Sequence, residues 1–445
     1  MRDCSEPTPA ARHSLPRPTL GPYRYVRWRW RVLFAIIDFL GDVLFAAGRA
    51  MRRLLHPGRR TTAPAADPRR ILLVQLDHLG DAIISTVMLA ALRRRYPQAR
   101  IEVLASAWNR EVFQSAAEVD RVYVSRVNRF ARGPRLPLAW IASTFWWGLV
   151  LRRRKIDLGI DVRGEFPLAL LLWLTGARRR LGWNCGGGRF LLTDSPAFVP
   201  GRPEVASRWA QLAELGIAAP QSGRSGEPRF HAGDEARQMV RRELAQLARE
   251  HPAAERRVVV HVGAGTPAKQ WPIEHWQALL SRLVTRYAAQ VVLVGSATDR
   301  IIARAILGPG GWPGVVDWTG RLRLVELAAL LEESDLLVGA DSAPAHLAAA
   351  VAAPVVVLFS GTNDPGQWQP AGDRVCVIRH EVACQPCHRQ RCRFEGHPCL
   401  RRLSPDRVLA AIEQLLSREK GDRPPLPRRK GDSHHLPERP EGCCA

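Results

Sequence analysis

Two loops in the second half of the chain carry residue types that bind phosphate groups. In the first loop, Gly263, Gly265 and Thr266 follow a β-branched run at 258–262. Lys269 comes three residues later, and it is one of only four lysines among the 65 basic residues. Backbone N–H groups after a buried strand, assisted by one ammonium group, suit a diphosphate and stabilise the charge that builds up as it leaves. An ordinary strand-to-helix turn with an exposed lysine is the alternative interpretation.

The second loop starts at Asp341 and leads into a predicted helix. Ser342 and the first N–H groups of that helix suit a phosphate, and Asp341 is placed to bind ribose hydroxyls or to orient its neighbours. His346 lies one helical turn after Ser342, within reach of the same phosphates. A packed core histidine is the alternative at that position.

Asp81 is the candidate catalytic group in the first half of the chain. It follows Gly80 after the apolar strand 71–76, and ligands of open α/β sheets gather at the carboxyl ends of the strands. A carboxylate there can act as general base toward a hydroxyl, whereas the alternative is a residue that caps the next helix. Neither leading strand is followed by the G-x-G-x-x-G pattern, which argues against a dinucleotide-binding domain.

Alternating strands and helices must position these loops. The strand–helix–strand spacing that starts at 71 is typical of parallel βαβ units, and the alternation recurs from 258 to 359. At 445 residues the chain is too long for one ordinary core. We therefore predict an α/β protein with two doubly wound domains, divided into a basic, disordered N-terminal extension at 1–69, a first domain at 70–217, a connection at 218–256, a second domain at 257–416 and a disordered tail at 417–445.

The N-terminal extension contains an apolar stretch from Val32 to about Met51. Asp38 and Asp42 interrupt it on one helical face, and a charge at the bilayer centre costs at least ~2.5 kcal/mol. The interleaved Trp, Tyr and Arg residues at 23–31 suit the headgroup region of a membrane. We predict an amphipathic helix on a membrane surface, with a packed or partner-binding helix and a true span as the alternatives.

The cysteines do not form an even disulfide framework, because four of the nine cluster near the end of the second domain. Cys384, Cys387, Cys392 and Cys399 supply enough ligands for a structural zinc, although their spacing matches no standard finger. Reduced loop thiols and a redox or disulfide role are the alternatives. The N-terminus lacks the pattern of a secretory signal, so we expect a cytoplasmic protein. The net charge of +23 predicts anionic partners without choosing among them.

The chain resembles the bacterial heptosyltransferases of glycosyltransferase family 9, which assemble the lipopolysaccharide core. The segments that carry the resemblance extend in order over nearly the whole predicted ordered region: ILLVQLDHLGD at 71–81, DVRG at 161–164, HVGAGTPAKQWPIEHW at 261–276, GADSAPAHL at 339–347 and the stretch 355–368. The resemblance implies a GT-B fold, with two facing Rossmann-like domains that bind the acceptor and the nucleotide sugar respectively. It implies an inverting single displacement with no cofactor required for catalysis.

The resemblance also assigns roles to individual residues. Asp81 matches the proposed base, Lys269 a donor-phosphate ligand, and Asp341, Ser342 and His346 the donor-binding cluster. Ala343 and Gln75 depart from the family pattern, which makes the donor sugar less secure than glycosyl transfer itself.

The expected function is transfer of a heptose from ADP-heptose to a lipopolysaccharide core or related lipid-linked glycan. We expect Asp161, Arg163 and Arg178 to bind the anionic acceptor, with a solvated basic rim as the alternative for the arginines. We expect the protein to lie on the cytoplasmic side of the inner membrane as a peripheral enzyme. A catalytically inactive membrane-associated scaffold and a nucleic-acid-binding protein remain as competing hypotheses. We expect no nucleic-acid partner, since nucleic-acid binding leaves the two phosphate-type loops unexplained.

Overall fold

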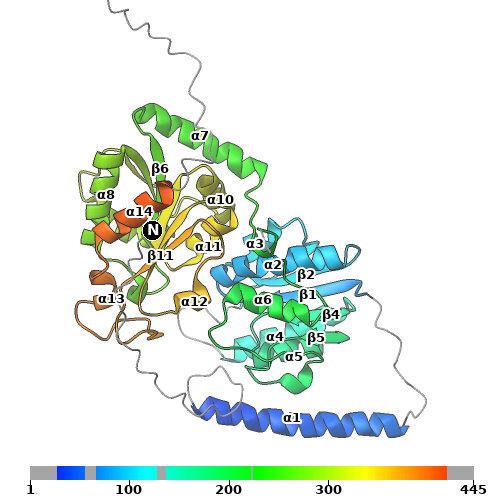
Figure 1. The fold of residues 1–445 in the computed structure, drawn as a ribbon. Helices are drawn as coiled ribbons and strands as arrows, with labels where there is room; N and C mark the ends of the chain where they lie inside the picture. Colours follow the sequence, from blue (N-terminus) through cyan, green and yellow to red (C-terminus); the bar gives the residue numbers. More distant parts are fainter. Residues whose placement is uncertain (1–27, 56–66, 128–136, 222–223, 418–445) are drawn as a thin grey trace, which may run out of the picture.

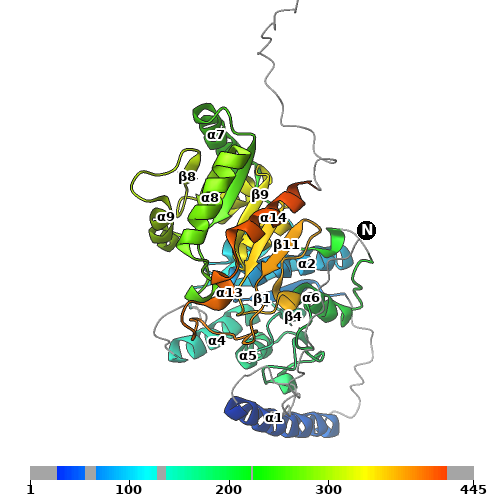
Figure 2. The same cartoon turned by 60° about the vertical axis from the view of Figure 1, so that its left-hand side comes forward.

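The computed structural model describes residues 28–55, 67–127, 137–221 and 224–417. Two sheets dominate it, and every strand pairing in both sheets is parallel. The first sheet has the order β3-β2-β1-β4-β5, and the second has the order β11-β10-β9-β6-β7-β8. Figures 1 and 2 show the two sheets in separate halves of the molecule, each flanked by helices. The prediction of two doubly wound α/β domains is confirmed.

The first sheet comprises β1 (Arg70–Gln75), β2 (Arg100–Ser106), β3 (Arg121–Ser125), β4 (Leu158–Asp161) and β5 (Arg179–Leu181). The second comprises β6 (Arg256–His261), β7 (Ala289–Val294), β8 (Val315–Asp317), β9 (Leu336–Ala340), β10 (Val355–Phe359) and β11 (Val375–Arg379). Their near-continuous Val, Ile and Leu runs suit strands that are buried on both faces.

The helices of the N-terminal half are α1 (Trp28–Leu55), α2 (Leu79–Arg95), α3 (Arg110–Gln114), α4 (Pro137–Arg152), α5 (Phe166–Leu174) and α6 (Glu204–Ala213), with a 3₁₀ turn η1 (Arg189–Leu191). Those of the C-terminal half are α7 (Asp234–Glu250), α8 (Ile273–Tyr287), α9 (Arg300–Leu307), α10 (Leu324–Glu332), α11 (Ala343–Ala350), α12 (Pro365–Trp368), α13 (Pro398–Arg401) and α14 (Pro405–Ser417), with the 3₁₀ turn η3 (Pro267–Lys269). Within the described ranges, no helix combines the length and apolar character required to cross a membrane.

Alternation along the strands sends side chains to two different cores. In β1, Ile71 and Leu73 pack with α2, whereas Leu72 and Val74 pack with α4 and α5 on the opposite face. The second sheet is covered in the same way, by α7, α10 and α11 on one face and by α8, α9 and α14 on the other. The interval 218–256, predicted as a connection, contains the helix α7, which is held to α10 by the Arg237–Glu332 ion pair at 2.7 Å.

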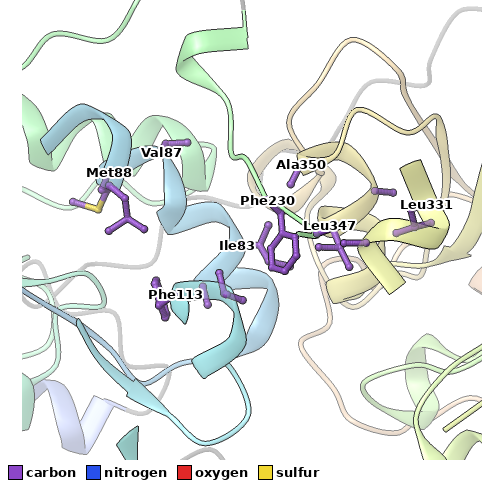
Figure 3. Packing of buried hydrophobic residues seen from close by; sticks show 14 of the residues in the cluster. Ile83, Val87, Met88, Phe113, Phe230, Leu331, Leu347 and Ala350 are labelled. Atoms are coloured by element: carbon purple, nitrogen blue, oxygen red, sulfur yellow. The ribbon is translucent and has the colours of Figure 1, made fainter. Parts of the chain in front are cut away.

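One hydrophobic core runs through both domains. Phe230, from the segment that joins them, lies between Ile83 of α2 and Leu347 of α11 (Figure 3). Its backbone N–H donates to the carbonyl of Ala350 at 3.4 Å. The facing ends of α2 and α11 are therefore fixed to each other by buried apolar surface, which stabilises their relative position.

Candidate active site

The site lies where the first turns of α2 and α11 meet. Each helix follows a central strand of its sheet, so its N-terminus is at the carboxyl edge where ligands bind in open α/β sheets. The two turns touch at Gly80: a Cβ built there would lie 3.2 Å from Cδ2 of His346 and 3.9 Å from Cα of Ala343. Asp81, the predicted base, is the next residue. The contact thus brings the predicted base and the predicted donor cluster together at the boundary between the two domains.

On the donor side, Lys269 forms an ion pair with Asp341. Its Nζ lies 2.6 Å from Asp341 Oδ2 and also donates to the Asp341 carbonyl at 3.2 Å. The side chain of Asn363 donates to the same carboxylate oxygen at 2.8 Å. Loops after β6, β9 and β10 therefore meet at one carboxylate. Asn363 was not among the predicted site residues, although its place just after a predicted strand end was the available signal.

Two buried histidines lie beside this ion pair. Burial lowers the pKa of His346 to about 4, while Asp341 opposes the shift and Lys269 adds to it. Burial likewise lowers the pKa of His261 to about 4, opposed by Asp299. His261 Nδ1 lies 3.3 Å from the Ser342 hydroxyl, which itself donates to the Ala340 carbonyl at 3.0 Å. Both rings are neutral near pH 7, so Lys269 supplies the formal positive charge in this cluster.

The glycine loop divides into a covered and an accessible part. A Cβ on Gly263 would lie 2.4 Å from the Asp299 carboxyl carbon, so this glycine makes room for Asp299. Gly265 is exposed and Thr266 is partly exposed, and both remain accessible to a ligand. The loop closes when the Lys269 N–H donates to the Thr266 carbonyl at 2.9 Å. Of the three predicted donor-binding residues in this loop, Gly265 and Thr266 are accessible, whereas Gly263 is buried.

On the acceptor side, Asp81 is in the first turn of α2 and only 7% exposed. Its backbone carbonyl accepts a hydrogen bond from the Ser85 hydroxyl at 2.8 Å. The buried Arg208 guanidinium reaches that hydroxyl in turn, at 3.2 Å, and pairs with Glu204. A buried, hydrogen-bonded framework therefore holds the backbone that carries the candidate base.

Arg163 reaches the same edge of the sheet from the loop after β4. Its guanidinium donates to the carboxylates of Asp77 and Glu165, and a quarter of its side chain remains exposed. Asp161 is fully buried and accepts backbone hydrogen bonds from residues 163, 164 and 165 at 2.9, 3.0 and 3.2 Å. Burial raises its pKa to about 7, although the three N–H donors oppose the shift. Asp161 thus shapes the turn that directs Arg163, and its own carboxylate is buried.

Two aromatic side chains that were not among the predicted site residues, Trp108 and Trp140, lie at the same edge of the sheet. The Trp108 indole N–H donates to the Asp77 carbonyl at 2.8 Å, and its ring stacks on His78 with a centroid distance of 6.0 Å. Trp140, near the start of α4, lines a small pocket together with Asp77 and Arg163. A flat aromatic beside charged groups suits a sugar, which offers both C–H faces and hydroxyls. A lone Trp gives no periodic signal, so sequence alone did not select these residues.

Arg178 is not brought to this site. It precedes β5, and its guanidinium lies 3.8 Å from Asp157, which precedes β4. Since the strands are parallel, this pair lies at the opposite edge of the sheet from Asp81 and Arg163. The side chain is 86% exposed, which fits the interpretation of a solvated basic rim.

The four clustered cysteines converge in a loop that covers η3. Burial raises the pKa of the Cys399 thiol, and the neighbouring residues Cys392, Cys384 and Cys387 add to the shift. The loop contacts the donor side where the Ala268 N–H donates to the Gln390 carbonyl at 3.1 Å. Among the residues that the structure describes, however, no three His, Cys, Asp or Glu side chains are grouped so as to hold a metal ion. The structural zinc gains no support from this arrangement.

Two Rossmann-like domains that face each other, with a base candidate on one and a phosphate-type site on the other, have the architecture of the GT-B class. The comparisons with known proteins agree. The family model "Glycosyltransferase family 9 (heptosyltransferase)" matches residues 148–397, more than half of the chain. The chain belongs to this family and is a glycosyltransferase.

Individual relatives support the same assignment. Lipopolysaccharide heptosyltransferase 3 of Escherichia coli is 27% identical over 345 residues, which are 76% of this chain and 96% of the relative. The structure of E. coli ADP-heptose lps heptosyltransferase II matches with a TM-score of 0.62 at 24% identity, covering 79% of this chain and 99% of that one. E. coli heptosyltransferase WaaC with ADP matches with a TM-score of 0.58 at 20% identity, covering 78% and 99% respectively.

Proposed function

We propose that the protein transfers a heptose from ADP-heptose to a lipopolysaccharide core or related lipid-linked glycan, with inversion at the anomeric carbon. The observation that carries the proposal is the contact between Gly80 and His346, because it sets the Asp81 turn against the Lys269–Asp341 cluster. The names of the relatives, lipopolysaccharide heptosyltransferases, and the relative solved with ADP support this donor and this class of acceptor.

The donor diphosphate would bind at the start of α11. Ser342 and the first N–H groups of that helix would donate to phosphate oxygens, and Gly265 and Thr266 would approach from the other loop. Lys269 would exchange part of its contact with Asp341 for the diphosphate, whose negative charge it stabilises as the glycosidic bond breaks. Asp341, relieved of part of its ion pair, remains available to ribose hydroxyls.

The chemical step needs one base. Asp81 takes the proton of an acceptor hydroxyl while that oxygen forms a bond to the anomeric carbon of the donor sugar. The bond from that carbon to the diphosphate breaks, and its electron pair leaves with ADP. One displacement inverts the configuration and forms no sugar–enzyme bond. Arg163, oriented by the turn that Asp161 holds, would bind an anionic group of the acceptor.

This step requires no cofactor, because Lys269 and the helix N–H groups would stabilise the negative charge of the leaving diphosphate. A structural zinc at the cysteine cluster stays a prediction. A lipid-linked acceptor would place the enzyme on the cytoplasmic face of the inner membrane as a peripheral protein. We expect no nucleic-acid partner.

Calorimetric titration of the full-length protein with ADP, UDP, GDP and dTDP tests the donor assignment. We expect ADP to bind selectively, and Lys269→Ala to weaken binding roughly tenfold or more, since a charge-assisted bond contributes about 1.5–3 kcal/mol. Lys155→Ala, at an exposed lysine of the other domain, is the matched control and should bind as the wild type does.

The reaction itself is tested by incubating the enzyme with ADP-heptose and a heptose-deficient core acceptor. Formation of the extended glycan with release of ADP supports the proposal. Binding of a different nucleotide would change the expected donor sugar but would leave glycosyl transfer as the proposed reaction. A folded protein that binds no nucleotide would refute the proposed reaction and favour a catalytically inactive scaffold of the same fold.

A further inference from the structure

The helix α1 turns its acidic residues toward the protein and its apolar residues outward, the reverse of a helix that covers a domain in water. Its two acidic residues face the protein: Asp38 is 3% exposed and accepts the Gly188 N–H at 2.6 Å, and Asp42 pairs with Arg189. Several large apolar side chains face outward instead, namely Ile36 (52% exposed), Phe39 (67%), Leu40 (53%), Val43 (52%) and Leu44 (70%). A surface helix normally buries its apolar stripe and exposes its charges.

Aromatic contacts fix α1 in this orientation. Phe45 packs edge-on against Phe190 and Trp173, with ring centroids 5.3 and 6.2 Å apart, and Phe34 packs against Phe166 at 5.9 Å. The glycine loop 186–188 admits the helix closely, since a Cβ at Gly187 would lie 2.4 Å from the Phe34 ring. Figures 1 and 2 both show α1 along the outside of the N-terminal domain, beyond the layer that contains α4 and α5.

The neighbouring helices continue the apolar surface. The α4 helix packs on α5 and exposes Ile141, Phe145, Trp146 and Leu149, of which Trp146 is 65% exposed. On α5, Trp173 is 42% exposed and touches α1 through Phe45. Three adjacent helices thus expose large apolar side chains, which exceeds the scattered exposure usual for a soluble surface. We call the outward-facing residues of α1 and α4 named here, with Trp173, the apolar face.

The charged residues in the sequences of α1, α4 and α5 are mainly arginines. The sequence of α1 contains five arginines, all within its first four or last seven residues, and its only acids are the two that face the protein. The only charged residue of α4 is Arg152, which is exposed and followed by the exposed Arg153; α5 has no charged residue. Long cationic side chains at the ends of an apolar helix suit a bilayer surface, where they reach anionic headgroups.

The apolar face also adjoins the acceptor side of the active site. Phe166, which Phe34 of α1 contacts, comes three residues after Arg163, the candidate acceptor ligand. The α4 helix supplies Trp140 to the pocket beside Arg163 and, on its outer side, Trp146 to the apolar face. A surface that holds this face would therefore lie next to the pocket.

We infer that the apolar face formed by α1, α4 and α5 docks the protein on an anionic lipid bilayer, with α1 lying in the plane of the headgroups. The bilayer is favoured over a second copy of the chain because two faces with arginine-rich ends would repel each other, whereas anionic lipid attracts both the arginines and the apolar side chains. The inference concerns where the protein binds and does not depend on the donor in the proposed function.

Flotation of the full-length protein with vesicles tests the inference. One set of vesicles contains phosphatidylcholine alone, and in the other about a third of the lipid is anionic phosphatidylglycerol. We expect binding to the anionic set that weakens with added salt. The double variant Leu44→Gln/Trp146→Gln should bind about tenfold more weakly for each substitution, because each removes apolar area from the headgroup region. Ile301→Gln is the control, since Ile301 is 77% exposed on α9 of the other domain.

Several outcomes would overturn the docking surface: no flotation of the wild type, flotation that ignores lipid charge, or equal binding by the double variant and the control. A wild-type dimer that the double variant converts to monomer, without vesicle binding by either, would assign the apolar face to self-association. ADP titration of each preparation separates the two proposals. A wild type that binds ADP but no vesicles refutes docking alone, and a wild type that binds anionic vesicles but no ADP refutes the proposed function alone.

Discussion

At the scale of single residues, the positive charge of Lys269 in the candidate donor site is already balanced by a carboxylate. Lys269 is paired with Asp341, and burial keeps His346 and His261 neutral near pH 7. A ligand gains from Lys269 only if it competes with the carboxylate of Asp341. A diphosphate that also offers ribose hydroxyls to Asp341 can do so better than inorganic phosphate, which favours a complete nucleotide.

The base assignment predicts a selective loss of rate. Asp81→Asn should lower kcat by about 10²- to 10⁴-fold, because the amide cannot accept the hydroxyl proton, and should leave ADP affinity within about twofold. Steady-state kinetics together with calorimetry measure both quantities. Asp373→Asn, at an exposed aspartate, is the control. Unchanged kcat in Asp81→Asn would remove Asp81 from the mechanism.

The pKa of His346 predicts a pH dependence of stability. Its folded value, about 4, is below the usual 6.5, so between these values the unfolded chain binds a proton that the folded chain does not. The contribution of His346 to stability is therefore lost as the pH is lowered from about 6.5 to 4, whereas Asp161, whose pKa is raised, contributes in the opposite sense. In urea unfolding, the wild type should lose about 3 kcal/mol more over this interval than His346→Gln. Parallel curves for the two proteins would contradict a buried neutral histidine.

At the scale of elements, strand ends and helix starts account for most of what the sequence predicted. Asp81, Lys269 and the residues 341–346 all follow apolar strands, and parallel strands bring such positions to one edge. Asn363, Trp108 and Trp140 could not be found in the same way, because their place depends on which loops fold over the edge. Arg178 shows the converse: an arginine cluster in sequence gives no information about which edge of the sheet it will occupy.

The position of α1 leads to a test at this scale. Asp38→Asn should release the α1 segment, since it weakens a buried bond to the Gly188 N–H whose loss costs about 1–3 kcal/mol. Hydrogen exchange of the amides at 28–55 should accelerate accordingly. Asp42→Asn removes only a partly exposed ion pair, which is worth about 0–1 kcal/mol, and should change exchange little. Equal protection in both variants would mean that the packing of α1 on the N-terminal domain does not depend on Asp38.

At the scale of the whole molecule, the two domains share a core that sequence patterns could not reveal. Periodicity predicted two sheets and their helices, but it carries no information on how one domain packs against the other. The contact is made by Phe230 between Ile83 and Leu347, and Phe230 lies in an interval predicted as a connection. Apolar residues in a segment rich in Gly, Pro and Arg gave only a weak signal.

The shared core predicts that stability and domain arrangement change together. Phe230→Ala should cost about 3–5 kcal/mol, because it removes a buried aromatic side chain, and should raise the radius of gyration in solution scattering. Phe394→Ala, at a phenylalanine that is 45% exposed, should change stability by no more than about 0.5 kcal/mol. An unchanged radius in a destabilised Phe230→Ala protein would show that other contacts suffice to hold the domains.

The missing side chain at Gly80 has a consequence for the reaction path. A Cβ there would lie 3.2 Å from the His346 ring, so the turn that carries the candidate base and the helix that carries the candidate donor residues are in close contact at Gly80. The lack of a side chain at Gly80 therefore allows the first turns of α2 and α11 to approach this closely. We expect any larger residue at this position to push the two helix starts apart and to increase the distance over which the sugar is transferred.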